Sequence, residues 1–176
     1  MIFTETPLKG AYIIEPEKKE DNRGFFARTF CQKEFESYGL NPFIAQCNIS
    51  LNLKKGTVRG MHYQMHPYEE EKVVWCARGA IYDVIVDLRN TSNTYKKWFG
   101  VELSEDNYKM LYIPKGFAHG FQTLKDETLI FYQMTEYYNP DYARGIRWDD
   151  AEVGIEWPLK EITMSEKDKM LGYLEL

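Results

Sequence analysis

The sequence predicts an all-β protein, a double-sheet jelly roll with a few short helices, as one domain over residues 1–176. Aromatic residues reach 15% of the chain, with 13 Tyr and 10 Phe, and they favour strands. The candidate strands are short and numerous, and turn residues separate them. The run AIYDVIVDLR at residues 80–89 alternates as a strand does. A chain of 176 residues is also long enough for one domain with its own core.

The expected elements follow one another with short connections. The predicted strands are 10–15, 24–30, 43–53, 57–64, 71–78, 80–88, 98–103, 109–113, 119–124 and 128–138. Two short helices are expected at 32–39 and 165–171. Gly39 suits the end of the first helix. Ser165, with Asp168 three residues later, comes close to a capping box at the start of the second. A jelly roll of this kind can hold one small ligand between its sheets.

The strand at 80–88 carries two acids on one side. Its faces are Tyr82, Val84, Val86 and Leu88 on one side, and Ile81, Asp83, Ile85 and Asp87 on the other. Two acids on an otherwise apolar face indicate that it looks into a polar cavity at one end. The commoner alternative is the solvent side of an antiparallel sheet.

Charge and cysteine content narrow the class of protein. A net charge of −5 argues against nucleic acid as the main partner. Three cysteines without a CxxC pair (Cys31, Cys47 and Cys76) indicate reduced thiols in the cytoplasm. The opening MIFTETPLKG lacks a basic region followed by an apolar stretch, so we expect no signal peptide. No apolar run approaches the length that spans a bilayer, so no membrane partner is expected.

Two segments carry the most specific spacing. GTVRGMHYQ at 56–64 contains a glycine, five residues and His62, and YIPKGFAHGF at 112–121 contains Pro-x-Gly-x-x-His ending at His119. These spacings resemble the two motifs of cupins. A metal-binding cupin would add a histidine and a glutamate at the positions of Gln64 and Lys72. Charged lysine has no lone pair for a metal, so we expect no metal. A metal-dependent cupin enzyme remains the alternative.

Several side chains near these motifs suit proton chemistry. His62 shares its strand face with small and polar residues, which leaves room for a ligand, and histidine suits a general base. An isolated histidine is more often structural, but two at pocket positions favour function. Lys72 is either a surface lysine or a cation aimed into the pocket to stabilise an oxyanion. Arg59 lies three residues before His62, so it points to the other face unless a bulge intervenes.

The chain as a whole resembles the dTDP-4-dehydrorhamnose 3,5-epimerase family of cupin-like nucleotide-sugar epimerases, from about residue 5 to about 170. The segments that carry the resemblance are DNRGFFARTF, AQCNIS, GTVRGMHYQ, AIYDVIVDLR, YIPKGFAHGF, FYQMTEYYNP, GIRWDD, GIEWP and SEKD. The resemblance implies cofactor-free epimerisation beside a C4 ketone, most simply of dTDP-4-dehydro-6-deoxyglucose to dTDP-4-dehydrorhamnose. A base removes the C3 or C5 hydrogen, an enolate forms, and an acid returns a proton to the other face.

The resemblance also implies roles for particular residues. His62 would be the base, oriented by Asp168, with Asp83 as a rival partner. Lys72 would stabilise the enolate oxygen. Tyr132 would be the acid, because its ordinary pKa near 10 suits a proton donor at neutral pH. Tyr138 is the second choice for the acid, by its even spacing from Tyr132 along the predicted strand.

The implied partner is a nucleotide-diphosphate sugar, bound by residues spread along the chain. The family's contacts fall on Arg23, Gln46, Asn48, Arg59, His119 and Lys167, with Tyr138 as a further substrate-binding candidate. Arg23 and Arg59 would grip the diphosphate through forked hydrogen bonds. The family implies a homodimer, with Arg23 acting across the interface.

Two departures from the family pattern bear on specificity. Arg28 and Ala143 stand where the family commonly has glutamate on the ligand side. These changes leave open which nucleotide and sugar are accepted. They also leave open the alternatives of an epimerase acting only at C3 or C5, or a ketoisomerase of another nucleotide sugar.

Overall fold

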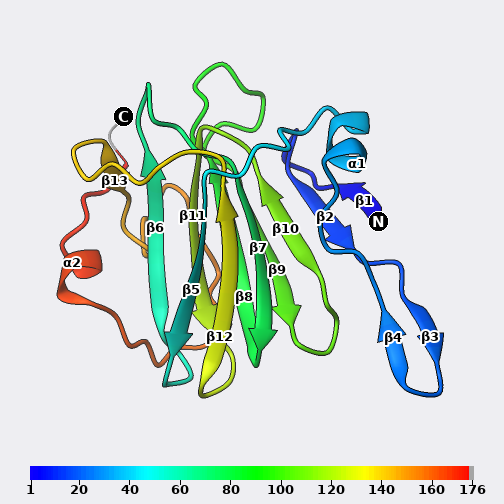
Figure 1. Ribbon diagram of the computed structural model, residues 1–176. Coiled ribbons are helices and arrows are strands. Elements are labelled where there is room, and N and C mark those ends of the chain that lie inside the picture. Colours follow the sequence, from blue (N-terminus) through cyan, green and yellow to red (C-terminus); the bar gives the residue numbers. More distant parts are fainter. Residues whose placement is uncertain (175–176) are drawn as a thin grey trace.

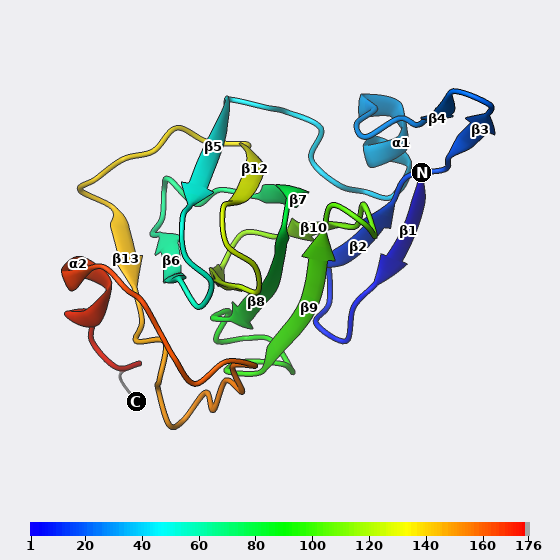
Figure 2. The ribbon, with the colours of Figure 1, turned by 90° about the horizontal axis from the view of Figure 1, so that it is seen from below.

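The computed structural model describes residues 1–174, which form two antiparallel sheets packed face to face (Figures 1 and 2). The first sheet has the order β1 (Ile2–Glu5), β2 (Tyr12–Glu15), β10 (Met110–Ile113), β7 (Lys72–Arg78), β12 (Thr128–Met134) and β5 (Gln46–Asn52). The second has the order β13 (Ala143–Gly145), β6 (Val58–Gln64), β11 (Phe117–Thr123), β8 (Ala80–Asp87) and β9 (Trp98–Ser104). The predicted cupin-like jelly roll is therefore confirmed.

Apolar side chains from both sheets fill one end of the space between them. Val74 of β7, Ile85 of β8, Leu111 of β10 and Ile130 of β12 belong to this buried cluster. Every second residue of these strands faces the space between the sheets, because successive side chains on a strand point to opposite faces. The apolar packing leaves the region beside β5, β6 and β12 for polar side chains.

The segment after β13 covers the outer face of the second sheet. Ile146 and Val153 pack there against Met61, Val84 and Val86. This cover carries the chain to α2 (Glu166–Lys169), which lies beside β6 (Figure 1). The C-terminal region thereby places a polar helix next to the strand that bears His62.

Three parts of the predicted secondary structure were wrong. The expected strand 24–30 is a small hairpin of β3 (Lys19–Asp21) and β4 (Gly24–Phe26), followed by α1 (Gln32–Ser37). β12 ends at Met134, not at residue 138. Strands β1, β3 and β13 were not predicted, because they are only three or four residues long. Within residues 1–174, neither helix has the length and apolar character needed to cross a membrane.

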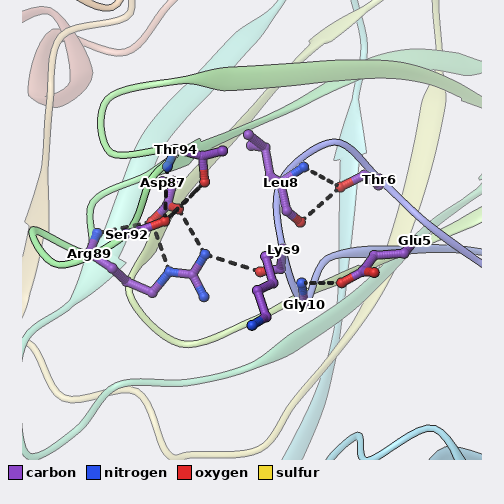
Figure 3. A network of polar contacts seen from close by, with 9 residues as sticks. All are labelled: Glu5, Thr6, Leu8, Lys9, Gly10, Asp87, Arg89, Ser92 and Thr94. Atoms are coloured by element: carbon purple, nitrogen blue, oxygen red, sulfur yellow. Dashed lines mark hydrogen bonds and ion pairs between the residues drawn. The ribbon is translucent and has the colours of Figure 1, made fainter.

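A buried polar network ties the end of β8 to the turn between β1 and β2 (Figure 3). Asp87 accepts hydrogen bonds from the Arg89 guanidinium and from the Ser92 and Thr94 hydroxyls, at 2.6–2.8 Å. Arg89 Nη2 also donates to the Lys9 carbonyl at 3.0 Å. Burial alone would raise the pKa of Asp87, but these donors lower it to about 2.

Candidate active site

A cavity of about 590 Å³ opens between the two sheets. Its walls come from β5, β7 and β12 of the first sheet and from β6 and β11 of the second, with α2 and the segment around β13 at one side (Figure 2). The predicted site residues in its lining are Gln46, Asn48, Arg59, His62, Lys72, His119, Tyr132, Tyr138, Lys167 and Asp168. Arg23 alone among the predicted residues lies elsewhere.

His62 of β6 and Asp168 of α2 form a hydrogen-bonded pair across more than a hundred residues of sequence. His62 Nε2 lies 2.7 Å from Asp168 Oδ1. The Gly60 amide donates to Asp168 Oδ2 at 3.4 Å. Ser165 is the N-cap residue of α2, and its hydroxyl accepts a hydrogen bond from the Asp168 amide at 3.1 Å. The helix terminus thus holds the carboxylate in place, and the carboxylate orients the imidazole.

The environment of this pair suits proton abstraction. Burial alone would raise the pKa of Asp168, but the hydrogen bond and charge of His62, with the Gly60 amide and the Ser165 hydroxyl, lower it. Asp168 therefore stays ionised at neutral pH. The His62 side chain is 44% exposed, and its Nε2 is engaged by the carboxylate. Its Nδ1 is the ring nitrogen left to take a proton from a ligand.

A bulge in β6 turns Arg59 into the same cavity as His62. His119 pairs with His62, but Phe121 pairs with Arg59, so β6 uses one residue more than β11 between these pairs. Gly60 in the bulge has φ +123°, and a Cβ there would lie 2.6 Å from the Cα of Gly120. Arg59 was expected to point away from His62 unless a bulge intervened. The bulge is present, so both side chains line the cavity. Arg59 Nε donates to Asn52 Oδ1 at 2.7 Å.

A second histidine–aspartate pair lies beside the first. His119 of β11 stands in register with His62, and its Nε2 lies 2.7 Å from Asp83 Oδ1. Asp83 is fully buried on β8. The open choice of partner for His62 is thereby settled, because Asp168 contacts His62 and Asp83 contacts His119. The face of β8 that bears Asp83 lies between the two sheets and not in solvent, but none of its residues lines the cavity, and Ile81 and Ile85 belong to the apolar core.

Tyr132 projects into the cavity from β12, on the sheet opposite His62. Burial raises the pKa of the Tyr132 phenol, and the nearby charge of Arg59 lowers it only in part. The phenol is therefore protonated at neutral pH. Tyr138 also lines the cavity, but the prediction that it shares a strand face with Tyr132 was wrong, because β12 ends four residues earlier. Its backbone amide donates to Gln46 Oε1 at 3.0 Å.

Lys72, the first residue of β7, points into the cavity and forms an ion pair with Glu70. Its Nζ lies 2.8 Å from Glu70 Oε1. The Lys72 side chain is 12% exposed and that of Glu70 is 4% exposed. Glu70 was missed from sequence because it lies within the run EEEK, where its two neighbours look identical. Only the folded loop shows that Glu70, two residues before Lys72, is buried and contacts it.

Arg23 and Arg28 both lie away from the cavity of their own chain. Arg23 is in the β3–β4 hairpin, which extends from the body of the molecule (Figure 1), and pairs with Asp21 at 2.6 Å. Arg28 pairs with Glu34 of α1 at 2.7 Å. Of the two departures from the family pattern, Ala143 alone lies in the cavity wall.

The cupin metal positions hold side chains with other partners. Gln64 donates to the carbonyls of Tyr68 and Tyr137 and accepts from the Asn139 amide, so its amide braces the loops around the cavity. Within residues 1–174, no group of three or more His, Cys, Asp or Glu side chains is placed to hold a metal ion. The polar side chains that face the cavity are of types that can transfer protons and bind anions: histidine, tyrosine, lysine and arginine.

Comparison with known proteins gives a consistent match over nearly the whole chain. The family model for dTDP-4-dehydrorhamnose 3,5-epimerase matches residues 5–175. The epimerase of that name from Methanothermobacter thermautotrophicus is 46% identical, over 95% of this chain and 91% of its own. The crystal structure of the Bacillus anthracis epimerase, with TDP and PPi bound, has a TM-score of 0.95 and 42% identity, and covers 98% of this chain and 99% of that one.

A third similar protein is the epimerase of Legionella pneumophila, solved in complex with dTDP-4-keto-L-rhamnose. It has a TM-score of 0.92 and 37% identity, and covers 98% of this chain and 92% of that one. Fold and site together define a cupin-like jelly-roll enzyme of the isomerase class. The chain belongs to the dTDP-4-dehydrorhamnose 3,5-epimerase family.

Proposed function

We propose that this protein epimerises C3 and C5 of dTDP-4-dehydro-6-deoxyglucose, giving dTDP-4-dehydrorhamnose without a cofactor. One observation carries the proposal: the His62–Asp168 pair and the Tyr132 phenol face one cavity from opposite sheets. A planar enolate between them can lose a proton to one side and gain a proton from the other. That geometry inverts a carbon, whereas a base and an acid on one side would return the original configuration.

The proposed reaction begins at the carbon beside the C4 ketone. His62 Nδ1 takes the proton as the C–H bond breaks, and the electron pair moves into the ketone to form an enolate. Asp168 supports the imidazolium that results. The Lys72 ammonium stabilises the enolate oxygen. Tyr132 then gives its proton to the other face of the carbon, and exchange with water restores His62 and Tyr132 before the second centre reacts.

The nucleotide end of the cavity is proposed to lie toward β5 and α2. Arg59 and Lys167 carry charges there, and Asn48 of β5 offers an amide group. Gln46 of β5 offers a second amide group nearer to Lys72, because both residues lie in register with Met134. The guanidinium of Arg59 uses Nε for Asn52, which leaves its terminal nitrogens for phosphate oxygens. His119 stands beside His62 on the neighbouring strand β11 and lines the same cavity, where it suits a contact to the diphosphate.

The proposed working form is a homodimer. The outward side of β5 exposes Ile49 (68%) and Leu51 (48%), and Leu53 follows at 67%. Ile49 pairs with Phe131, whose ring stacks on Trp75 at 4.3 Å, so the apolar strip crosses three strands. An exposed apolar strip that continues over neighbouring strands favours cover by a second copy. The Arg23 side chain, 85% exposed on the projecting hairpin, would reach the partner's cavity. Ile49→Asp should give a monomer by light scattering.

The proposed location is the cytoplasm. Cys31, Cys47 and Cys76 are all free, and Cys47 lies exposed on the outward side of β5. Free thiols, one of them exposed, favour a reducing compartment.

The test is proton NMR of dTDP-4-keto-6-deoxyglucose with the protein in heavy water. Loss of the C3 and C5 hydrogen signals, with appearance of the rhamno product, is the expected result. Exchange at one carbon would replace this proposal with a single-centre epimerase. No exchange at either carbon would overturn the assigned substrate, and Ala143 in the cavity wall would be the first position to restore, as Ala143→Glu.

A further inference from the structure

Glu70 stands in the cavity wall as a buried carboxylate with one partner. Its Oε1 lies 2.8 Å from Lys72 Nζ, and its side chain is 4% exposed. Among the described residues, nothing donates to its buried Oε2. A buried charge is costly unless it is paired, and the partner that compensates the Glu70 charge is the Lys72 ammonium.

The ion pair restricts the most flexible side chain of the proposed reaction site. A lysine ammonium is a point charge on a four-carbon stem, free to rotate unless something holds it. Glu70 engages one of its three donors and leaves the others for the cavity. Preorganised charge stabilises a developing oxyanion better than charge that must first be ordered, because the ordering cost is already met.

The pair also divides the cavity by charge. Within residues 1–174, the other cations of the lining (Arg59, Arg144 and Lys167) form no ion pair with a carboxylate, whereas Lys72 does. A diphosphate carries its full negative charge before any reaction begins, whereas a ketone oxygen gains charge only as the enolate forms. Glu70 repels the diphosphate. Through the Lys72 ammonium that it orients, Glu70 still helps to stabilise the ketone oxygen as that oxygen gains charge.

From this arrangement we infer that Glu70 is a positioning residue and an orientation filter. It holds the Lys72 ammonium toward the ketone oxygen, and it keeps the diphosphate out of the Lys72 end of the cavity. The inference rests on the proposed function, in which Lys72 stabilises the enolate. It assigns Glu70 no contact with the reacting atoms.

Turnover tests the positioning role. Glu70→Ala should lower kcat about 10- to 100-fold and change KM by less than about threefold, because a misplaced catalytic group costs up to about 10²-fold. Glu70→Gln, which keeps an oxygen for Lys72, should recover a large part of the lost kcat. In a Lys72→Met background, Glu70→Ala should lower kcat no further. Equal losses in the two backgrounds would overturn the role, because Glu70 would then act independently of Lys72.

Binding of inorganic pyrophosphate tests the filter without turnover. Titration calorimetry should show Glu70→Gln binding pyrophosphate about fivefold tighter than the parent protein, or binding a second equivalent, because Lys72 then offers an uncompensated charge. Unchanged affinity and stoichiometry would overturn the filter. Glu69→Gln is the matched control, since Glu69 contacts His66 at 3.3 Å outside the cavity lining. It should leave both kcat and pyrophosphate binding unchanged.

The two experiments separate this inference from the proposed function. If the parent protein does not exchange hydrogens of any 4-keto sugar nucleotide, the proposed function fails, and the pyrophosphate comparison still tests the filter. If the parent is active and the Glu70 variants match it in kcat and in pyrophosphate binding, the inference fails alone. Melting temperatures of all variants within about 3 °C of the parent would show that folding is not the cause.

Discussion

Asp83 and Asp87 lie four residues apart on the same face of β8, and both are fully buried, yet their surroundings differ. Asp87 accepts hydrogen bonds from Arg89, Ser92 and Thr94 and belongs to the network that joins the end of β8 to the β1–β2 turn (Figure 3). Asp83 contacts the ring of His119 beside the cavity, and its Oδ2 has no partner among the described residues.

The difference separates a structural end of the barrel from a functional one. At the Asp87 end, donors and acceptors satisfy one another, which stabilises the turn and lowers a pKa. At the cavity end, polar groups keep spare capacity: an unpaired oxygen on Asp83, another on Glu70, and unbonded nitrogens on His62 and His119. Unsatisfied buried groups of this kind cost stability, and proteins tolerate them mainly at functional sites.

The largest expected effect is at the cavity end. His62→Ala should lower kcat/KM about 10³-fold or more, because general-base catalysis contributes about 10² to 10⁴ and no other group replaces it. The free energy of unfolding should change by less than about 1 kcal/mol, since the ring is 44% exposed. Steady-state kinetics with dTDP-4-keto-6-deoxyglucose and urea denaturation measure both. A variant with one tenth of parental activity would remove His62 from the role of base.

The converse variant is at the structural end. Asp87→Asn should lower the free energy of unfolding by about 3 kcal/mol, because hydrogen bonds to a charged group are worth about 1.5–3 kcal/mol each and only some survive. Activity per folded molecule should stay near the parent value, because Asp87 lies outside the cavity lining. Urea denaturation measures the change in stability, and kcat per folded molecule measures the activity. A large loss of kcat in folded protein would show that the two ends are coupled.

Tyr132→Phe tests the acid on the opposite wall. We expect kcat to fall about 10²-fold, because the phenol proton is lost while the ring still packs. Exchange of the C3 or C5 hydrogen with solvent should fall less than net epimerisation, since His62 can still remove a proton and return one to the same face. NMR in heavy water measures both rates. An equal fall in the two rates would argue for Tyr132 acting before proton removal.

The smallest effect is a pH dependence of stability at the Asp87 end. The pKa of Asp87 is about 2 in the folded protein against 3.8 ordinarily. A lowered carboxyl pKa stabilises the fold fully above the ordinary value, and this stability is lost as pH falls toward 2. The whole contribution is about 2 kcal/mol by linkage, and roughly two-thirds of it is lost by pH 2.5. Urea denaturation from pH 6 to pH 2.5 should show it, and Asp87→Asn should flatten the curve. An equal slope in that variant would assign the effect to other carboxylates.

The sequence predicted the limits of four of the longer strands well, whereas the end of β12 was placed four residues too late. Strands β6, β7, β8 and β9 lie within one residue of their expected limits, because five or more alternating residues carry a clear period. The short strands β1, β3 and β13 carry no such period. β13 forms because β6 offers it an open edge, which is a tertiary property.

The candidate site shows the same division. His62 and His119 stand out from glycine and histidine spacing alone, and the family resemblance named Asp168, Lys72 and Tyr132. The direction of Arg59 depended on a bulge in β6 that spacing could allow but not decide. Tyr138 reaches the cavity from a loop, not from a strand face, because β12 stops at Met134. Glu70 could not be told from its neighbours in the run EEEK.

By itself, the sequence determined the fold class, the family and the two histidines of the cavity, because alternation and motif spacing are local properties of the chain. Tertiary structure alone decided which aspartate serves which histidine, with Asp168 at His62 and Asp83 at His119. It also decided that Glu70 is the carboxylate beside Lys72. Charge pairing depends on distances between atoms that are set by the packing of two sheets and one helix, and no spacing along the chain encodes those distances.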